Sequence, residues 1–408
     1  MLCDLTQSYA ETGGGIRTYL HEKRRWLLQT TPHRHVLVVP GAEDAVHVEG
    51  RATTVTVRSP YVPGSTSYRL MLRNRAVRRA LAEAAPDVIE TLDAYNLPWA
   101  ALAHRREHPG TAVIGGYRTD FPRAYVSGYG ERLVGRVLPD RAAQAVAGWA
   151  ERRADAYAAR LYRRMDRVYT LSPKRAEALQ HLGVPDVAVL PLGVDLGVFR
   201  PEARSDARRA SWGLSPGRPP ASPPAFVYVG RLDSEKRPDL VVDAFEKLPV
   251  ELGAALVLVG EGPMRADLEG RAAQLRAAGR TLVVAPYETD RGALAETLAS
   301  ADLYVSAMAH ETFGISVAEA QACGLPVVGV DAGAMPARVP PSVGRLATPD
   351  DAGAFADQVL SVLDGHVAAM SLAARAHAEE HYDWSRTFQR VLEIYDSALA
   401  ARARRGTR

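Results

Sequence analysis

Cysteine is nearly absent from this sequence, since only Cys3 and Cys323 occur among 408 residues. Neither stands at the spacing of a metal-binding motif, so we expect both to be small, buried side chains. Long apolar runs are absent too, because no stretch approaches the roughly 18 residues of a membrane span. The N-terminus also lacks a basic region followed by a long apolar segment. These absences predict a cytoplasmic protein.

Lysine is the second scarce residue, because only four of the 50 basic residues are lysine and the others are arginine. Such usage is typical of a bias in the whole coding sequence, so the net charge of +3 is weak evidence for a nucleic-acid partner. We therefore expect no nucleic-acid binding. Where arginine is the default, a retained lysine such as Lys236 indicates a need for a compact charge.

The length of the chain exceeds the size at which a single core stops growing, so we expect two domains. Apolar runs typical of strands alternate with helical patterns, which is the rhythm of a parallel α/β sheet. A polar, proline-rich segment at 215–224 precedes the second domain, and we expect it to be mobile. The expected strands lie at residues 1–5, 35–40, 53–57, 88–92, 112–115, 167–171 and 187–190, and then at 226–229, 255–259, 283–286, 303–306 and 327–330.

The most informative stretch is 311–319, which carries two carboxylates. A helix expected at 316–323 would place Glu319 one turn inside it and Glu311 in the loop before it. The backbone amides of residues 313–315 would then point free at the helix start, where unpaired donors and the positive dipole end favour a phosphate. Carboxylates for hydroxyls and amides for an anion together suit a sugar nucleotide.

Five further segments accompany this stretch and complete a series that covers nearly the whole chain. They are Gly13-Gly14-Gly15, Thr119-Asp120-Phe121-Pro122, Leu190-Pro191-Leu192-Gly193-Val194-Asp195, Gly230-Arg231-Leu232 with Glu235-Lys236, and Val259-Gly260-Glu261-Gly262-Pro263. The series resembles the retaining GT-B glycosyltransferases of family 4. The resemblance implies an α/β fold with two Rossmann-like domains that face each other across a cleft, and a C-terminal helix that crosses back to the first domain.

On this basis the chain divides into an acceptor half and a donor half. The implied N-terminal, acceptor-binding domain comprises residues 1–193 together with the C-terminal helix 385–408. The implied nucleotide-sugar-binding domain comprises residues 194–384.

The resemblance also assigns catalytic residues. In relatives, an Arg-x4-Lys pair such as Arg231 and Lys236 neutralises the departing diphosphate, whereas the residues alone would favour surface pairing with nearby acids. Glu311 is expected to contact the transferred sugar near the reacting centre, and Glu319 to accept hydrogen bonds from the ribose hydroxyls.

Further donor-binding residues are implied at turns that follow the expected strands. Glycines there would let the donor lie against the backbone, although for the triple glycine a plain tight turn is the alternative. Tyr287 stands where relatives receive the base. The implied set is Thr312, Phe313, Gly314, Ile315, Gly14, Gly15, Gly230, Gly260, Gly262 and Tyr287.

Arg118 and Asp120 are assigned to the acceptor or to the donor sugar. In many relatives the position before Thr-Asp is a histidine that contacts the donor sugar, but Arg118 stands there in this sequence. Three interpretations stay open: a negatively charged donor, an acceptor with a phosphate or carboxylate, or a contact made by another residue. The structural alternative is that Arg118 only pairs with Asp120 or another acid.

The implied activity is that of a retaining hexosyltransferase of the EC 2.4.1 type. It would move a glucosyl, mannosyl or N-acetylglucosaminyl group from a nucleoside-diphosphate sugar, with UDP or GDP favoured, to an acceptor hydroxyl. The acceptor is expected to be a sugar, a lipid-linked sugar or a natural-product aglycone. No cofactor and no catalytic metal are expected, in keeping with the lack of an Asp-x-Asp motif.

Two arginine-rich helices are expected in the first domain, at 68–82 and 151–165. A basic amphipathic helix can lie on an anionic membrane, so peripheral contact at the inner membrane face is one interpretation. Plain solvated faces, given the arginine-rich composition, are the other.

Three other functions remain as alternatives. A catalytically inactive paralogue that only binds a nucleotide sugar would usually have lost one of the four charged residues, and none is missing. A nucleotide-sugar epimerase shares the architecture but lacks both the Glu-x7-Glu and the Arg-x4-Lys pattern. A dinucleotide oxidoreductase is disfavoured because no expected strand is followed by Gly-x-Gly-x-x-Gly.

Overall fold

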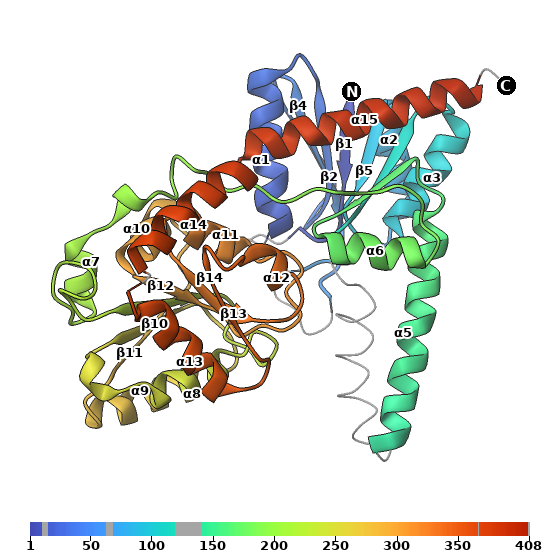
Figure 1. Cartoon of the computed structure of the whole chain (residues 1–408). Helices are drawn as coiled ribbons and strands as arrows, with labels where there is room; N and C mark the ends of the chain where they lie inside the picture. Colours follow the sequence, from blue (N-terminus) through green and yellow to red (C-terminus); the bar gives the residue numbers. More distant parts are fainter. Residues whose placement is uncertain (10–14, 63–67, 119–139, 366, 407–408) are drawn as a thin grey trace. The chain divides into compact units, whose positions relative to one another are not determined.

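The computed structural model describes residues 1–408 except 10–14, 63–67, 119–139, 366 and 407–408. The described residues form two compact units (Figure 1). The first unit comprises Met1–Pro191 and Ser385–Arg408, and the second comprises Leu192–Trp384. Each unit has its own sheet and its own buried core.

An eight-stranded sheet forms the centre of the first unit, in the order β3-β4-β2-β1-β5-β6-β7-β8. Neighbouring strands run parallel, except that β3 and β4 form an antiparallel pair at one edge. The strands are β1 (Leu2–Leu5), β2 (His35–Gly41), β3 (Ala45–Glu49), β4 (Ala52–Arg58), β5 (Val88–Thr91), β6 (Ala112–Tyr117), β7 (Arg167–Thr170) and β8 (Val187–Val189).

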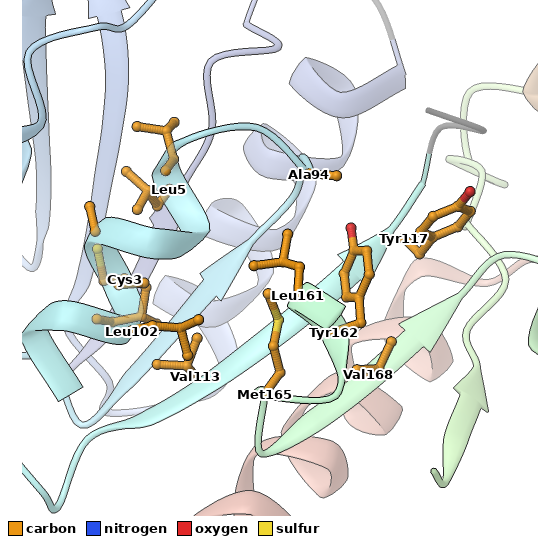
Figure 2. Close-up of a cluster of buried hydrophobic side chains, with 14 of the residues drawn as sticks. Cys3, Leu5, Ala94, Leu102, Val113, Tyr117, Leu161, Tyr162, Met165 and Val168 are labelled. Atoms are coloured by element: carbon orange, nitrogen blue, oxygen red, sulfur yellow. The ribbon is translucent and has the colours of Figure 1, made fainter. Parts of the chain in front are cut away.

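Helices cover this sheet, because a crossover between parallel strands needs a connection of helical length. Strands β1, β5 and β6 are buried along their whole length, as expected for a sheet covered on both faces. Figure 2 shows part of the core beneath, with Leu161, Tyr162 and Met165 beside residues of β6. The helices are α1 (Gly15–Thr30), α2 (Asn74–Ala84), α3 (Leu97–Glu107), α5 (Asp140–Tyr162), α6 (Pro173–His181) and the C-terminal α15 (Trp384–Gly406).

The second unit has a six-stranded, fully parallel sheet in the order β11-β10-β9-β12-β13-β14. The strands are β9 (Ala225–Val229), β10 (Ala255–Val259), β11 (Thr281–Ala285), β12 (Leu303–Val305), β13 (Val327–Val330) and β14 (Gly344–Ala347). The helices are η2 (Pro201–Ala203), α7 (Asp206–Ser211), α8 (Pro238–Lys247), η3 (Val250–Leu252), α9 (Arg265–Ala277), α10 (Arg291–Ser300), α11 (Ile315–Ala322), α12 (Met335–Arg338), α13 (Ala352–Leu363) and α14 (Val367–His381).

Two doubly wound α/β sheets are thus present, as the sequence predicts. Every strand expected from an apolar run is found, whereas β3 and β14 were not expected. All five residues of β3 are exposed, so this edge strand lacks the buried face that makes a strand recognisable. Among the described residues, no single helix is both long and apolar enough to cross a membrane, and only α13 and α14 taken together as a bent pair reach that criterion.

The C-terminal helix joins the first sheet through one buried carboxylate. Glu90 on β5 is fully buried and accepts hydrogen bonds from three tyrosine hydroxyls. These are Tyr19 on α1, at 3.0 Å, Tyr169 on β7 and Tyr395 on α15. Ser385–Arg408 belong to the first unit.

Lys23 supplies the positive charge of this network. Its ammonium lies 2.5 Å from Asp4 and 2.9 Å from Glu90, which are directly opposite each other on β1 and β5. Burial lowers the pKa of Lys23, but the two carboxylates raise it more, so the net pKa lies above its ordinary value. His35 completes the cluster as a neutral ring, because its Nδ1 accepts from Arg24 Nε at 3.0 Å while its Nε2 donates to Asp4 at 2.8 Å.

The proline-rich segment 215–224 is hydrogen-bonded to one buried arginine of the second unit. The guanidinium of Arg209, which is fully buried, donates to the Ser222 hydroxyl at 3.0 Å and to the Pro223 carbonyl at 2.8 Å. The same guanidinium pairs with Asp302 at 2.8 Å. An arginine at a distant position thus ties the segment to the sheet, and the local composition gives no sign of it.

We predict that Lys23→Met destabilises the first unit by about 3–5 kcal/mol, because it leaves two buried carboxylates without their shared cation. Urea denaturation, with hydrogen exchange of the β1 and β5 amides to locate the effect, measures this loss. Lys174→Met, at an exposed position of α6, is the matched control and should change little. Equal losses in the two variants would contradict the role given to Lys23.

Candidate active site

The carboxyl ends of β9 and β10 meet at one edge of the second sheet, because these neighbouring strands run parallel. Gly230 follows β9, and its amide donates to the Val259 carbonyl at 3.0 Å. Gly260 follows β10, and its amide donates to the Ala285 carbonyl at 3.1 Å. Gly262 stands two residues further along the same turn. This edge is where ligands bind in open α/β sheets.

Lys236 and Glu311 form an ion pair in the second unit. Lys236 Nζ lies 2.9 Å from Glu311 Oε2, and the two side chains are only 23% and 14% exposed. Burial raises the pKa of Glu311, but the ammonium of Lys236 and the amides of Phe313 and Thr312 together lower it more, so the net pKa is below its ordinary value. Glu311 is therefore a carboxylate at neutral pH. A phosphate that bound Lys236 would compete with Glu311 for the same ammonium.

Glu311 also organises the turn into α11. Its Oε1 accepts from the Thr312 amide at 3.1 Å and faces the Phe313 amide at 3.5 Å. The next residue, Gly314, has a φ of 80°, a left-handed conformation that glycine adopts without steric cost. The helix begins at Ile315, one residue before the expected start. The amide at 313 is thus not free as expected, because the carboxylate of Glu311 occupies it.

Glu319 lies inside α11 and is 4% exposed. Its Oε1 accepts a hydrogen bond at 2.5 Å from Nη2 of Arg291, which is the first residue of α10. Burial raises the pKa of Glu319 above its ordinary value, although Arg291 opposes this rise. The guanidinium of Arg291 in turn lies over the ring of Phe199, 4.6 Å from its centroid. Glu319 is therefore held in a fixed position by a residue that the motif does not contain.

Arg231 follows Gly230 and is 62% exposed at its side chain. It pairs with Asp233 and, at 2.7 Å, with Glu235, which is the local surface pairing that the residues alone favour. Tyr287 stands two residues after β11 and is 48% exposed, so its ring is available to a ligand. The side chains of Arg231 and Tyr287 are thus exposed, whereas that of Glu319 is buried.

In the first unit, Arg118 follows β6 and is only 6% exposed. Its Nη2 and Nε donate to the Tyr169 hydroxyl at 2.8 and 3.1 Å, and its guanidinium lies 3.5 Å from the centroid of the Tyr19 ring. Because Tyr169 also donates to Glu90, Arg118 belongs to the buried network. Gly15 is the first residue of α1, while Gly14 and Asp120 lie outside the described residues.

Asp93 follows β5 at the same end of the first sheet and is 7% exposed. Its Oδ2 accepts from the Thr6 hydroxyl at 2.7 Å and from the Gln7 amide at 2.8 Å. Its Oδ1 is buried and has no hydrogen-bond partner among the described residues. Burial raises the pKa of Asp93 to about 6, although hydrogen bonding from Thr6 and from the backbone of Gln7 and Ser8 opposes this rise.

Two family models match the chain in succession. The model of glycosyltransferase family 4 matches residues 13–198, and that of glycosyl transferases group 1 matches residues 216–379. A GDP-mannose-dependent alpha-(1-6)-phosphatidylinositol dimannoside mannosyltransferase of Mycobacterium tuberculosis is 32% identical over 324 residues, which cover 78% of this chain and 76% of the relative. The chain belongs to the family 4 glycosyltransferases.

Two further similarities extend this assignment. A GDP-mannose-dependent alpha-mannosyltransferase of the same species is 31% identical over 310 residues, covering 75% of this chain and 72% of the relative. Sucrose-phosphate synthase of Thermosynechococcus elongatus has a TM-score of 0.74 at 19% identity, covering 98% of this chain and all of that structure. This glycosyltransferase therefore has the GT-B fold, and it is a sugar transferase that uses a nucleotide-sugar donor.

The contacts bring together part of the predicted donor site of this glycosyltransferase. Lys236, Glu311, Thr312 and Phe313 are joined by direct interactions, with Gly314 next in the chain. Glu319 and Ile315 lie on the helix that follows. Asp233 links Arg231 to this set, because its Oδ2 accepts from the Arg231 guanidinium and its Oδ1 accepts from the Lys236 amide at 3.0 Å.

Sequence reasoning missed Arg291 and Asp93. Arg291 gave no signal, since it is one of many arginines and its partner stands in another helix. Asp93 could have been found, because an acidic residue directly after an apolar strand lies at the carboxyl end of a parallel sheet, where ligands bind.

The two basic helices of the glycosyltransferase differ in extent from those expected. Helix α2 begins at Asn74 and not at 68, and Arg69 instead pairs with Tyr61 in a β-bridge. Helix α5 covers Asp140–Tyr162 and not 151–165. Large apolar side chains are exposed beside both basic stretches: Leu72 is 64% exposed and Trp149 is 55% exposed.

A metal site is not evident in the described part of the chain, where no group of three or more His, Cys, Asp or Glu side chains is arranged to hold an ion. Cys3 and Cys323 are both buried, as expected.

Proposed function

We propose that this glycosyltransferase moves a mannosyl group from GDP-mannose to an acceptor hydroxyl, with retention of the anomeric configuration. The observation that carries the proposal is the Lys236–Glu311 pair at the turn into α11, with Glu319 fixed inside that helix. A cation for the diphosphate, from the loop after β9, thus stands beside a carboxylate for the sugar, and the helix that follows this carboxylate carries another for the ribose hydroxyls. GDP-mannose is preferred because the names of the two mycobacterial relatives both specify it as donor.

The proposed chemistry breaks the bond between the anomeric carbon and the diphosphate oxygen. Negative charge then develops on the leaving diphosphate, which Lys236 and Arg231 stabilise electrostatically. For this, Arg231 must leave Asp233 and Glu235, and Lys236 must exchange Glu311 for the phosphate. The acceptor oxygen bonds to the anomeric carbon on the face that the diphosphate leaves, and its proton passes to a phosphate oxygen. This front-face route gives retention without a protein nucleophile.

The carboxylates have separate tasks in this proposal. Glu311, released from Lys236, accepts a hydrogen bond from a hydroxyl of the transferred sugar. Glu319 accepts from the ribose hydroxyls while Arg291 keeps its side chain in place. No cofactor and no catalytic metal are part of the proposal.

We predict that the wild-type protein binds GDP in the micromolar range without added metal, and that Glu319→Ala weakens this binding at least about tenfold by removing the ribose contact, about 1.4 kcal/mol. Titration calorimetry with GDP, UDP, ADP and TDP measures this. Glu393→Ala, at an exposed position of α15, is the control. Tighter binding of another nucleotide would overturn the choice of GDP. If none of the four nucleotides bound, the proposed donor site would be wrong.

Product analysis completes that test. Proton NMR of the mannoside formed from GDP-mannose should show the α configuration of the donor. A β product would exclude retention. An isomerised nucleotide sugar formed without acceptor would identify an epimerase, and nucleotide binding without any product would identify an inactive paralogue.

Lys236→Ala should lower kcat at least about tenfold, or about 1.4 kcal/mol of barrier, because the leaving diphosphate loses its cation. Lys247→Ala, the nearest other lysine and an exposed one, serves as the matched control. Initial rates of GDP release from GDP-mannose provide the measurement. Equal rates in the two variants would remove Lys236 from the catalytic set.

The acceptor is proposed to carry its hydroxyl on a sugar or a lipid-linked sugar, since one relative is named for a phosphatidylinositol dimannoside substrate. Peripheral contact with an anionic membrane through the basic helices α2 and α5 then gives access to such an acceptor. The exposed Trp149 on α5, with Arg153 beside its ring at 5.3 Å, supports this.

Vesicles that contain anionic lipid should co-sediment the wild-type protein at low salt. Trp149→Ala should reduce the bound fraction at least about threefold, because an interfacial aromatic anchor is lost. Trp212→Phe removes a tryptophan from a buried site of the second unit. It is the control for effects of losing a tryptophan that do not involve contact with the vesicle. Absence of wild-type binding to anionic vesicles would exclude the membrane contact.

A further inference from the structure

Arg338 is a buried arginine of the second unit and the last residue of α12, which Figure 1 labels. Its side chain is 5% exposed, and its Nε donates to the Phe313 carbonyl at 3.1 Å. Its guanidinium also lies over the Phe313 ring, 4.1 Å from the centroid. None of the sequence motifs contains Arg338. Because a cation is costly to bury, an arginine buried against the turn into α11 calls for an explanation.

The bond to the Phe313 carbonyl fixes the direction of the amide that follows it. The peptide bond between Phe313 and Gly314 is trans, so the carbonyl of Phe313 and the N–H of Gly314 point in opposite directions. A guanidinium that holds this carbonyl therefore turns the Gly314 amide away from itself. No described residue accepts from that amide, whereas Glu311 takes the amides of Thr312 and Phe313.

Gly314 is the residue that caps the start of α11. The first amides of a helix have no partner within the helix, and the positive end of the helix dipole lies beside them. Amides in this position bind anionic groups such as phosphates. Of the three amides at 312–314, only that of Gly314 is left for an anionic ligand, and its direction depends on Arg338.

Arg338 is itself held in place by its surroundings. The Tyr382 hydroxyl hydrogen-bonds its guanidinium and lies 3.2 Å from His377 Nε2. The backbone carbonyl of Arg338 accepts from Gln321 Nε2 at 2.7 Å, on α11. The rings of Phe313 and Tyr382 pack edge to face, with 5.9 Å between their centroids. These contacts leave the guanidinium little freedom to release the carbonyl.

The segment before Arg338 holds the same turn through a second bond. The Ala334 amide donates to the Glu311 carbonyl at 2.8 Å. A β-carbon at Gly333 would lie only 2.7 Å from that carbonyl oxygen, so glycine permits the close approach. The carbonyls of residues 311 and 313 are thus both held by donors of segment 334–338. A turn fixed in this way has its shape before a ligand arrives, which is the condition for preorganised electrostatic stabilisation.

We propose that Arg338 is a positioning residue of the donor site, which holds the Phe313 carbonyl and thereby aims the Gly314 amide at the diphosphate of the nucleotide sugar. Arg338 does not touch the donor in this role. The inference rests on the proposed function, because the diphosphate is that of the proposed donor. An arginine with a purely structural role would stabilise the second unit without favouring the phosphates over the rest of the nucleotide, and this difference makes the role testable.

Arg338→Met keeps the apolar stem of the side chain but removes its donors. Arg338→Lys keeps the charge and a donor and should restore part of the effect, whereas a role in packing alone would favour Met over Lys. Tyr382→Phe removes only the hydroxyl that holds the guanidinium, so it serves if neither substitution of Arg338 folds. Arg375→Met is the matched control, because Arg375 donates to the Ala322 carbonyl at 2.8 Å, at the other end of α11. Urea denaturation shows which variants are folded.

Calorimetry with GDP and ligand-observed NMR with guanosine give two affinities, and their ratio isolates the contacts of the phosphates. Arg338→Met should lower this ratio at least about tenfold, as expected for a lost hydrogen bond to a charged group. Arg338→Lys and Tyr382→Phe should lower it less, and Arg375→Met should keep the wild-type ratio. In ¹H–¹⁵N spectra, the Gly314 amide of the wild type should shift with GDP but not with guanosine, and this shift should be lost in Arg338→Met.

The proposal is overturned if the folded variants of Arg338 keep the affinity ratio of Arg375→Met, or if Tyr382→Phe does so where neither of them folds. A ratio in Arg338→Met that exceeds that in Arg338→Lys would also contradict it, as would a wild-type Gly314 amide that responds alike to GDP and guanosine. Failure of the proposed function shows separately, as an absence of GDP binding by the wild type.

Discussion

The carboxylate of Glu90 is the group on which the first unit depends. It receives hydrogen bonds from α1, β7 and α15, which are far apart in the sequence, and shares the ammonium of Lys23 with Asp4. Since all these groups are buried, none can turn to water when a partner is lost: loss of Lys23 leaves an uncompensated charge, and loss of a tyrosine leaves a buried acceptor without its donor. The same carboxylate reaches Arg118 through Tyr169, so the network that holds the sheet together also fixes a side chain at the carboxyl end of β6.

The charged residues proposed for the donor site of the second unit differ from this network, because they are paired with one another at partly exposed positions. Lys236 is bonded to Glu311, and Arg231 to two acids of its own loop. Under the proposed function, both cations exchange these acids for the diphosphate of the donor. Glu319 differs in that it is buried and its carboxylate is held from α10 by Arg291.

Much of the fold could be predicted from the sequence, because buried parallel strands are written as continuous apolar runs such as Ala255–Val259. The exposed β3 has no buried face, and the tie between Arg209 and segment 215–224 depends on a contact that local composition does not record. The site motif identified Glu311 and Glu319 by resemblance, but neither the capture of the 312 and 313 amides by Glu311 nor the support from Arg291 could be read from spacing. Both depend on side-chain directions that only the folded structure defines.

The membership of α15 in the first unit has a consequence for how the protein is made. Residues 385–408 follow the whole of Leu192–Trp384 in the chain, yet they supply Tyr395 to Glu90 and the ring of Phe388 to Tyr19 and Trp26. During synthesis the second unit, whose residues are continuous, can close on itself while the first still has an open face. Helix α15 is therefore synthesised last. The apolar surface of the first unit that this helix covers stays exposed while the whole second unit is translated.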